Sequence, residues 1–288
     1  MSVAHLRDRA LIALSGVDAE HFLQNIVTVD LDALAAGEAR PGALLTPQGK
    51  ILFDFLVSRT GETTILLECR ADVADDFVRR LMLYRLRAKV QISKQEQASV
   101  AVTWDSDSTA SQTDSPDLTD TRFVAPSFVQ RFYHDLPPAD AEIGAWHAFR
   151  IANGIAESGT DYALGDAFPH DVLLDELGGV GFRKGCYVGQ EVVSRMQHRG
   201  TARRRVLIVC AEGDLPTAGA DIVAGGRTLG ALGSVAENKG LAITRIDRVK
   251  DAIDADASIT VGDMPVSLSI PSWAKFTFPQ DAAADGEA

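Results

Sequence analysis

The sequence has little cysteine and no long apolar run, and each shortage excludes a class of protein. Its three cysteines, Cys69, Cys186 and Cys210, show no C-x-x-C spacing, so we expect neither a zinc site nor a disulfide framework. No stretch approaches the roughly 20 apolar residues of a membrane-spanning helix, and the N-terminus lacks the apolar region of a signal peptide. We therefore expect a cytoplasmic protein without a membrane partner, or a matrix protein if a targeting segment is missing.

Bases are also scarce, because 28 Lys and Arg stand against 40 Asp and Glu, for a net charge of −12. This balance argues against a protein that binds nucleic acid over its whole surface. The exception is the run Arg183–Arg205, in which seven bases meet one acid, Glu191. Such a local excess of positive charge indicates an anion site. We do not expect direct RNA binding through Arg195–Arg205, since no RNA-binding module is readable there.

The pattern of apolar residues changes once along the chain. The first half predicts a strand at 10–14, a helix capped by Asp18, a hairpin over 51–69 and helices over 71–86 and 140–153. From Arg205 onward, short strands without helices predict a small β-barrel or sandwich. We expect domains at 1–203 and 204–278, and a disordered tail at 279–288. The segment 105–120, with five Asp and no base, predicts an exposed, mobile loop that could be deleted.

Two further features of these segments bear on function. The helix over 71–86 ends in a second basic cluster without an acid, formed by Arg79, Arg80, Arg85, Arg87 and Lys89. Favourable placement near a helix C-terminus explains this cluster as well as anion binding does, and both interpretations stay open. Cys69 and Cys210 lie in apolar runs typical of strands, where a thiol is normally a buried core residue.

The octapeptide Lys184–Glu191 concentrates the reactive groups of the chain. Glycines on both sides of Cys-Tyr-Val allow a tight or positive-φ backbone that would expose Cys186 on a turn. If a helix begins just after the second glycine, its dipole and the bases Arg183 and Lys184 favour the thiolate. A buried structural thiol is the alternative. Glu191 is either an ion-pair partner of these bases or an acceptor that orients one of them.

A second constellation is Leu45–Phe55, where a Pro-Gln-Gly turn leads into a strand. Asp54 interrupts the apolar neighbours of this strand. Its carboxylate either faces outward on an alternating strand or points into a pocket.

The octapeptide resembles the K-G-C-Y-x-G-Q-E signature of the YgfZ family of folate-binding proteins. That family assists iron–sulfur cluster assembly and is related to the glycine-cleavage T-protein, an aminomethyltransferase. The resemblance covers nearly the whole chain through the segments Phe22–Asn25, Thr28–Asp30, Thr46–Phe55, Arg150–Ile155 and Arg199-Gly200. It implies a T-protein-like α+β fold of ferredoxin-like subdomains, a C-terminal antiparallel β-barrel, and tetrahydrofolate or a derivative in a central cavity.

The resemblance also indicates the site residues and partners. We expect Cys186 and Asp54 to be the reactive residues, and no metal ligand. A reduced folate needs an aromatic slot, polar groups for the pterin edge and bases for its glutamate tail. The expected ligand-binding residues are Phe53, Tyr84, Lys184, Tyr187, Gln190, Glu191 and Arg195. The expected partners are folate and, transiently, iron–sulfur assembly proteins or client enzymes.

Three departures from the aminomethyltransferases bear on activity. Ala152 stands where the relatives have a Glu that contacts the pterin, only Asp54 remains of an Asp pair, and an Asn is replaced near Glu68. Losing such partners weakens recognition or rate, so we do not expect glycine-cleavage activity. The leading function is a folate-binding accessory factor for assembly or repair of iron–sulfur enzymes. The alternative is a folate-dependent one-carbon transferase that acts on a protein or tRNA.

Overall fold

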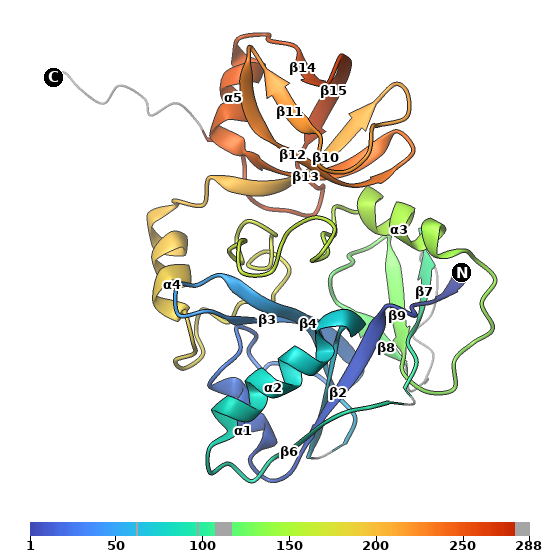
Figure 1. Ribbon diagram of the computed structural model, residues 1–288, viewed down its shortest axis with the longest axis vertical. Helices are drawn as coiled ribbons and strands as arrows, with labels where there is room; N and C mark the ends of the chain where they lie inside the picture. The colour runs from blue at the N-terminus through green and yellow to red at the C-terminus, as the bar shows by residue number, and fades with distance from the viewer. Residues whose placement is uncertain (62, 97, 107–116, 280–288) are drawn as a thin grey trace, which may run out of the picture. The chain divides into compact units, whose positions relative to one another are not determined.

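The computed structural model describes residues 1–61, 63–96, 98–106 and 117–279, and the chain divides into two compact units (Figure 1). The first contains Met1–His147, Leu164–Pro169 and Leu174–Gly200, and the second contains Ala148–Ala163, His170–Leu173 and the chain from Thr201 onward. The predicted disordered tail lies outside the described residues from position 280 onward. No helix in the described part of the chain is long and apolar enough to cross a bilayer.

Within the described residues, the first unit is built on a nine-stranded sheet in the order β1-β7-β9-β8-β3-β4-β5-β2-β6. All neighbouring strands are antiparallel except β3 and β8, which are parallel. The strands are β1 (Ser2–His5), β2 (Arg9–Ser15), β3 (Glu38–Leu45), β4 (Ile51–Arg59), β5 (Thr64–Arg70), β6 (Gln91–Lys94), β7 (Ala101–Asp105), β8 (Leu118–Asp120) and β9 (Phe128–Phe132). The hairpin predicted over 51–69 is confirmed as β4 and β5.

Strand β4 presents apolar side chains on the face of the sheet against which a helix packs. Ile51, Phe53 and Phe55 are buried in alternation with half-buried neighbours, because successive side chains of a strand point to opposite faces. Helix α2 (Ala74–Arg85), which follows a 3₁₀ turn at Ala71–Val73, packs Phe77 against this face. The Phe77 ring lies 4.6 Å from that of Phe53 and 5.6 Å from that of Phe55, centroid to centroid. Helix α1 (Ala19–Gln24) contributes to the same core.

The predicted helix at the N-terminus exists, but its predicted cap is wrong. Asp18 directly precedes α1 yet makes no side-chain cap hydrogen bond. Its Oδ2 instead accepts a hydrogen bond from the backbone N–H of Lys89 at 2.7 Å. The Asp18 carboxylate, which the local sequence predicted to cap the helix, therefore binds a backbone group 71 residues away in the chain.

The prediction of an exposed, dispensable loop over 105–120 is wrong at its C-terminal end. Residues 107–116 lie outside the described residues, but Leu118–Asp120 form β8 and the Asp120 side chain is fully buried. This carboxylate lies in the interior because two arginines, Arg122 and Arg131, pair with it. Deleting the whole segment would therefore remove a buried partner of both.

The second unit contains a closed antiparallel barrel in the order β10-β13-β12-β11-β14-β15, counted over the described residues. Its strands are β10 (Arg204–Ala211), β11 (Asp221–Ala224), β12 (Arg227–Ala236), β13 (Lys239–Arg245), β14 (Ile259–Val261) and β15 (Met264–Ser269). The expected α+β fold with a C-terminal antiparallel barrel is thus confirmed.

Two details of the barrel differ from the sequence-based expectation. Helix α5 (Ile246–Asp254) interrupts the strands and buries Ile246, Val249 and Ala252 in the barrel core. It was missed because five of its nine residues are charged. Cys210 is only half-buried, because it points away from the interior that Leu207 and Val209 fill, so the prediction of a core thiol is wrong there. For Cys69, which is buried, the same prediction is confirmed.

Candidate functional site

The octapeptide Lys184–Glu191 forms an irregular segment that leads into helix α4 (Gln190–Arg199). Gly189 stands at the N-cap position with a φ of 79°, a conformation that glycine adopts without strain. The side chain of Cys186, four residues before the helix, is exposed. Of the three cysteines it is the only exposed one, so this thiol is the one a partner molecule can reach.

Lys184 anchors the segment on the N-terminal side of the thiol. Its Nζ donates hydrogen bonds to the carbonyl oxygens of Val27 at 2.8 Å and Val29 at 2.7 Å. Burial lowers the pKa of Lys184 to about 8, although Asp30 and Asp32 act in the opposite direction. At neutral pH the amine is thus mainly protonated. Its charge lies against the 27–32 segment, and thiolate activation at Cys186 stays a prediction.

The 27–32 segment is itself held by a side-chain amide from α1. Gln24 donates through Nε2 to Asp30 Oδ1 at 2.8 Å and accepts from the backbone N–H of Leu31 at 2.8 Å. Thr28 donates its hydroxyl to the carbonyl of Gly179 at 2.7 Å and accepts from the backbone N–H of Ala43 at 2.9 Å. The segments Phe22–Asn25 and Thr28–Asp30, both part of the family resemblance, therefore position the two carbonyl groups that bind Lys184.

On the C-terminal side of the thiol, Gly189 meets the turn that precedes β4. A Cβ placed on Gly189 would lie 2.6 Å from the carbonyl oxygen of Thr46 and 3.1 Å from Cα of Gly49. Gly49 has a φ of 80°, and a Cβ on it would lie 2.9 Å from Cβ of Val192 in α4. The two constellations of the sequence are thus in direct contact, and only glycine at both positions permits this approach.

The remaining predicted ligand-binding residues of the octapeptide and α4 are placed as follows. Tyr187 is buried, with its ring centroid 5.4 Å from Lys184 Nζ, and burial raises its pKa to about 12. Gln190 is half-buried and begins α4. Glu191 pairs with Arg195 at 2.9 Å on the exposed face of α4, a surface pair of little energetic consequence.

Three predicted site residues lie elsewhere in the first unit. Phe53 stacks on Phe77 in the core and Tyr84 packs beside that core from α2. Asp54 is half-buried on the other face of β4, in register with Ala43 of β3. The structure thus brings Lys184 and Tyr187 together beside the thiol, whereas Phe53 and Tyr84 serve the packing of α2.

Several bases of the run Arg183–Arg205 are engaged by other groups of the protein. The run is divided between the two units. Arg205 is buried and donates to the carbonyl of His170 at 3.0 Å, and Arg204 lies 3.9 Å from Asp171. These contacts weaken the expectation that the run as a whole forms an anion site.

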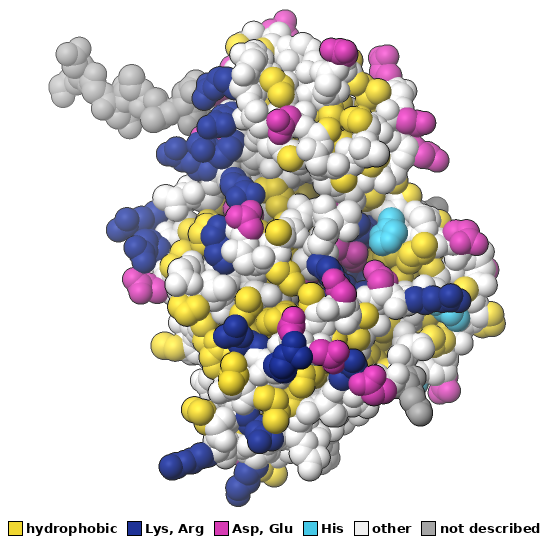
Figure 2. Space-filling model, viewed as in Figure 1, with side chains coloured by type: hydrophobic (Ala, Val, Ile, Leu, Met, Phe, Trp, Pro, Cys, Tyr) yellow, Lys and Arg dark blue, Asp and Glu magenta, His cyan; other side chains and the backbone are white. Residues whose placement is uncertain are grey.

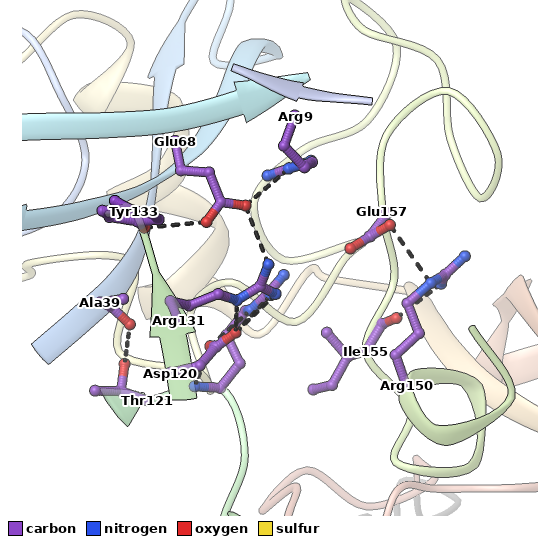
Figure 3. Close-up of polar contacts among 11 residues, drawn as sticks. Arg9, Ala39, Glu68, Asp120, Thr121, Arg131, Tyr133, Arg150, Ile155 and Glu157 are labelled. Atoms are coloured by element: carbon purple, nitrogen blue, oxygen red, sulfur yellow. Dashed lines mark hydrogen bonds and ion pairs between the residues drawn. The ribbon is translucent and has the colours of Figure 1, made fainter. Parts of the chain in front are cut away.

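A buried polar network in the first unit was not predicted (Figure 3). The Glu68 carboxylate on β5 accepts from Arg9 at 2.8 Å, Arg131 at 3.1 Å and the hydroxyl of Tyr133 at 3.0 Å. Arg131 on β9 also donates through Nε to Asp120 at 3.1 Å. The network joins strands that are far apart in the sheet order. The signal in the sequence was a charged residue within a largely apolar strand, Glu68 in β5 and Arg131 in β9.

These contacts determine the charge states in the network. Burial alone would raise the pKa of Asp120, but the adjacent guanidinium groups of Arg122 and Arg131 outweigh it, and the pKa is lowered. Burial, together with Glu68, raises the pKa of Tyr133 well above its usual value. Asp120 is therefore ionised and Tyr133 neutral under physiological conditions. Near Glu68, where the relatives' Asn was expected to be replaced, three donors engage one carboxylate.

In the second unit, Arg150 joins the end of helix α3 (Ile143–Ala152) to the barrel. Its guanidinium donates to the carbonyl of Ile155 at 3.1 Å, to Asp161 at 3.0 Å and to the hydroxyl of Ser234 on β12 at 2.7 Å. A Glu157 carboxylate oxygen lies 3.4 Å from Arg150 Nε. Figure 3 shows these two side chains pointing toward one another. Ala152, the last residue of α3, is exposed and offers no carboxylate.

Residues 203–276 match the family described as the CAF17 C-terminal beta-barrel domain. The chain also has the fold of a glycine cleavage system aminomethyltransferase T from Bartonella henselae, with a TM-score of 0.66 and 17% identity, covering 94% of this chain and 85% of that one. This likeness confirms the T-protein-like fold that the sequence indicated.

Several similar curated proteins carry the name iron–sulfur cluster assembly factor IBA57. The relative from Chaetomium globosum is 32% identical over 77% of this chain, which spans 60% of that protein's length. The relative from Pyricularia oryzae is 31% identical over 85% of this chain and 72% of its own. The human relative is 29% identical over 93% of this chain and 84% of its own.

These relatives overturn the prediction of a cytoplasmic protein, because each of them is named as a mitochondrial protein. The prediction rested on the absence of an apolar signal region. Mitochondrial targeting uses amphipathic, Arg-rich segments, which an apolar-run criterion does not detect.

Proposed function

Because this chain belongs to the family of the iron–sulfur cluster assembly factor IBA57, we propose that it assists the assembly of iron–sulfur clusters through Cys186. The observation that carries the proposal is the exposure of this thiol, in contrast to those of Cys69 and Cys210. A cluster is held by about four ligands, mainly thiolates. Cys186 would supply one ligand, and a partner protein that donates or receives the cluster would supply the others.

The geometry around Cys186 supports a presenting role. Lys184 holds the backbone two residues before the thiol, and the contact of Gly189 with Gly49 holds it three residues after. A thiol that must meet ligands on another protein benefits from a defined position, because less conformational freedom is lost on binding. The segment is thus pinned at both ends while its reactive atom is accessible.

The test is replacement of Cys186 by Ala in cells that lack the native protein, with the activities of iron–sulfur enzymes as readout. We expect these activities to fall to the level of cells that lack the protein altogether. The melting temperature of the purified variant should equal that of the wild type. Cys210→Ala is the matched control, since it removes a half-buried thiol from the barrel unit. Full rescue by Cys186→Ala would refute the assignment.

We further propose that the first unit binds tetrahydrofolate or a derivative. Support comes from the aminomethyltransferase fold and from the resemblance of the octapeptide to the folate-binding YgfZ signature. Calorimetric titration with tetrahydrofolate should give saturable heat, and Cys186→Ala should retain it. No heat at high ligand concentration would remove folate from the proposal and leave the thiol's role standing.

The one-carbon transferase is the second candidate. The shared fold favours it, whereas Ala152 at the end of α3 lacks the carboxylate expected to contact a pterin. Incubation with methylene-tetrahydrofolate and a protein or tRNA acceptor, followed by mass measurement of the acceptor, distinguishes the two functions.

A further inference from the structure

The outer face of α2 and the turn after it carry exposed apolar side chains. Leu83 is 69% exposed, Leu86 86% and Met82 41%. A surface helix normally buries its apolar face and presents polar groups to water. Helix α2 already buries Phe77 and Leu81 in the core, so these three residues are apolar groups beyond those the fold uses.

The same segment is strongly basic. From Phe77 to Val90 the sequence holds five bases and no acid, and apart from these it is apolar except for the hydroxyl of Tyr84. A helix C-terminus explains only one of the bases, since Arg85 alone lies in the last turn. From sequence alone, helix-end placement and anion binding explain this cluster equally well. Because Leu83 and Leu86 are exposed among these bases, we interpret the segment as an interaction surface.

The Gly16–Asp18 turn extends this surface. A Cβ on Gly16 would lie 2.3 Å from the carbonyl oxygen of Lys89, so the turn lies directly against the segment that follows α2. Val17 at its tip is 77% exposed. Figure 2 shows hydrophobic and basic side chains, with some acidic ones among them, over the region of α2. We call this set the α2 surface: Val17, Arg79, Arg80, Met82, Leu83, Leu86, Arg87 and Lys89.

Leu86 adds an independent observation. Its φ is 46° and its ψ −107°, a backbone conformation in which a leucine is strained and a glycine is not. A glycine is the usual residue where a helix ends in positive φ. An almost fully exposed leucine there does not serve the stability of the fold. Residues kept under strain at the surface are characteristic of functional positions.

We propose that the α2 surface binds the surface of an anionic phospholipid bilayer. Leucine, methionine and valine side chains would enter the boundary of the acyl chains while the surrounding bases contact lipid phosphates. The side chains of the α2 surface are cations and apolar groups, and the nearest carboxylates are already engaged: Asp76 pairs with Arg79, and Asp18 accepts a hydrogen bond from the backbone N–H of Lys89. That composition matches a uniformly anionic, apolar layer better than a protein surface of mixed donors and acceptors.

The acidity of the whole chain does not oppose this contact. At physiological ionic strength charges are screened beyond about 8 Å, so the bilayer interacts with the basic segment and little with distant acids. The expectation of no membrane partner rested on the lack of an apolar run that can span a bilayer. A peripheral contact requires no such run.

The test is co-sedimentation of the full chain with vesicles of phosphatidylcholine, with or without about 30% phosphatidylglycerol. The protein should sediment with the anionic vesicles only, and high salt should release it. Arg80→Glu combined with Arg87→Glu should weaken binding at least about twentyfold, since each base near an anionic surface contributes a factor of about five. The matched control is Arg227→Glu combined with Ile253→Ser, which alters an exposed base and an exposed isoleucine of the barrel unit.

Leu86→Gly separates lipid binding from folding. It should weaken binding severalfold while leaving the melting temperature unchanged or higher, because glycine relieves the strained φ. Wild-type protein that stays in solution with anionic vesicles overturns the proposal. So does equal binding of the wild type and the α2-surface variants. If the variants instead lose affinity for an acidic protein and not for vesicles, the surface belongs to a protein partner and the proposal is wrong.

Discussion

Gly49 and Gly189 touch across 140 residues of chain, so that a Cβ on Gly189 would lie 3.1 Å from Cα of Gly49. This contact locks the turn before β4 to the start of α4, three residues after the exposed thiol. It also explains why two glycines with positive φ stand in the two motifs that the sequence singled out. The position of Cys186 thus depends on residues that take no part in chemistry themselves.

Gly189→Ala is expected to destabilise the protein by about 2 kcal/mol or more. The new methyl group would strain a φ of 79° and press on the carbonyl oxygen of Thr46 at 2.6 Å. Denaturant unfolding measures the effect. Gly185→Ala is the control within the same octapeptide, because a Cβ there would meet nothing within 4 Å. Equal stabilities of the two variants would contradict the close approach.

The thiols should react in the order of their exposure. Cys186 is expected to be alkylated first by iodoacetamide at neutral pH and Cys210 more slowly, while Cys69 reacts only on unfolding. Burial raises the pKa of Cys69 to about 12, so its reactive thiolate is scarce as well as inaccessible. Mass spectrometry of timed digests resolves the three sites. Labelling of Cys210 ahead of Cys186 would contradict the exposed position of the octapeptide.

Lys184 should make the stability depend on pH in the alkaline range. Its pKa falls from 10.5 to about 8 on folding, so between these values the unfolded chain binds more protons than the folded one. The contribution of Lys184 to stability is therefore fully present above pH 10.5 and is lost as the pH falls through about 8. The melting temperature of the wild type relative to Lys184→Met should rise over this range. If the difference in melting temperature between the wild type and Lys184→Met did not change with pH, the Lys184 ammonium group would be solvated and its pKa would not be lowered by burial.

Asp120→Asn is expected to destabilise the fold by about 3–5 kcal/mol, because it leaves Arg122 and Arg131 buried without a full counter-charge. Thermal unfolding should show a decrease of roughly 10 °C. Asp76→Ala is the control: it breaks the exposed pair with Arg79 and should change stability by less than about 1 kcal/mol. A mild effect at Asp120 would mean that the 105–120 segment is as dispensable as its composition suggested.

Local patterns predicted the parts of the fold whose signals lie within a few residues. The run Ile51–Ser58 before the Thr60-Gly61 turn predicted a strand, and the spacing of Phe77 and Leu81 predicted the helix that covers it. Helix α5 escaped because its apolar residues are few and its charges many. Asp120 was misjudged because composition describes the neighbours of a residue along the chain and not those in space.

The sequence by itself determined the element pattern, the family resemblance and the placement of a thiol between two glycines before a helix. Only the tertiary structure decided which groups surround that thiol. Lys184 reaches the carbonyl of Val27 across a sequence separation of 157, and Glu68 meets Arg131 across 63. Periodicity and propensity report on interactions within one or two turns of chain. The direction of a long side chain and its charged partner depend on how distant strands pack.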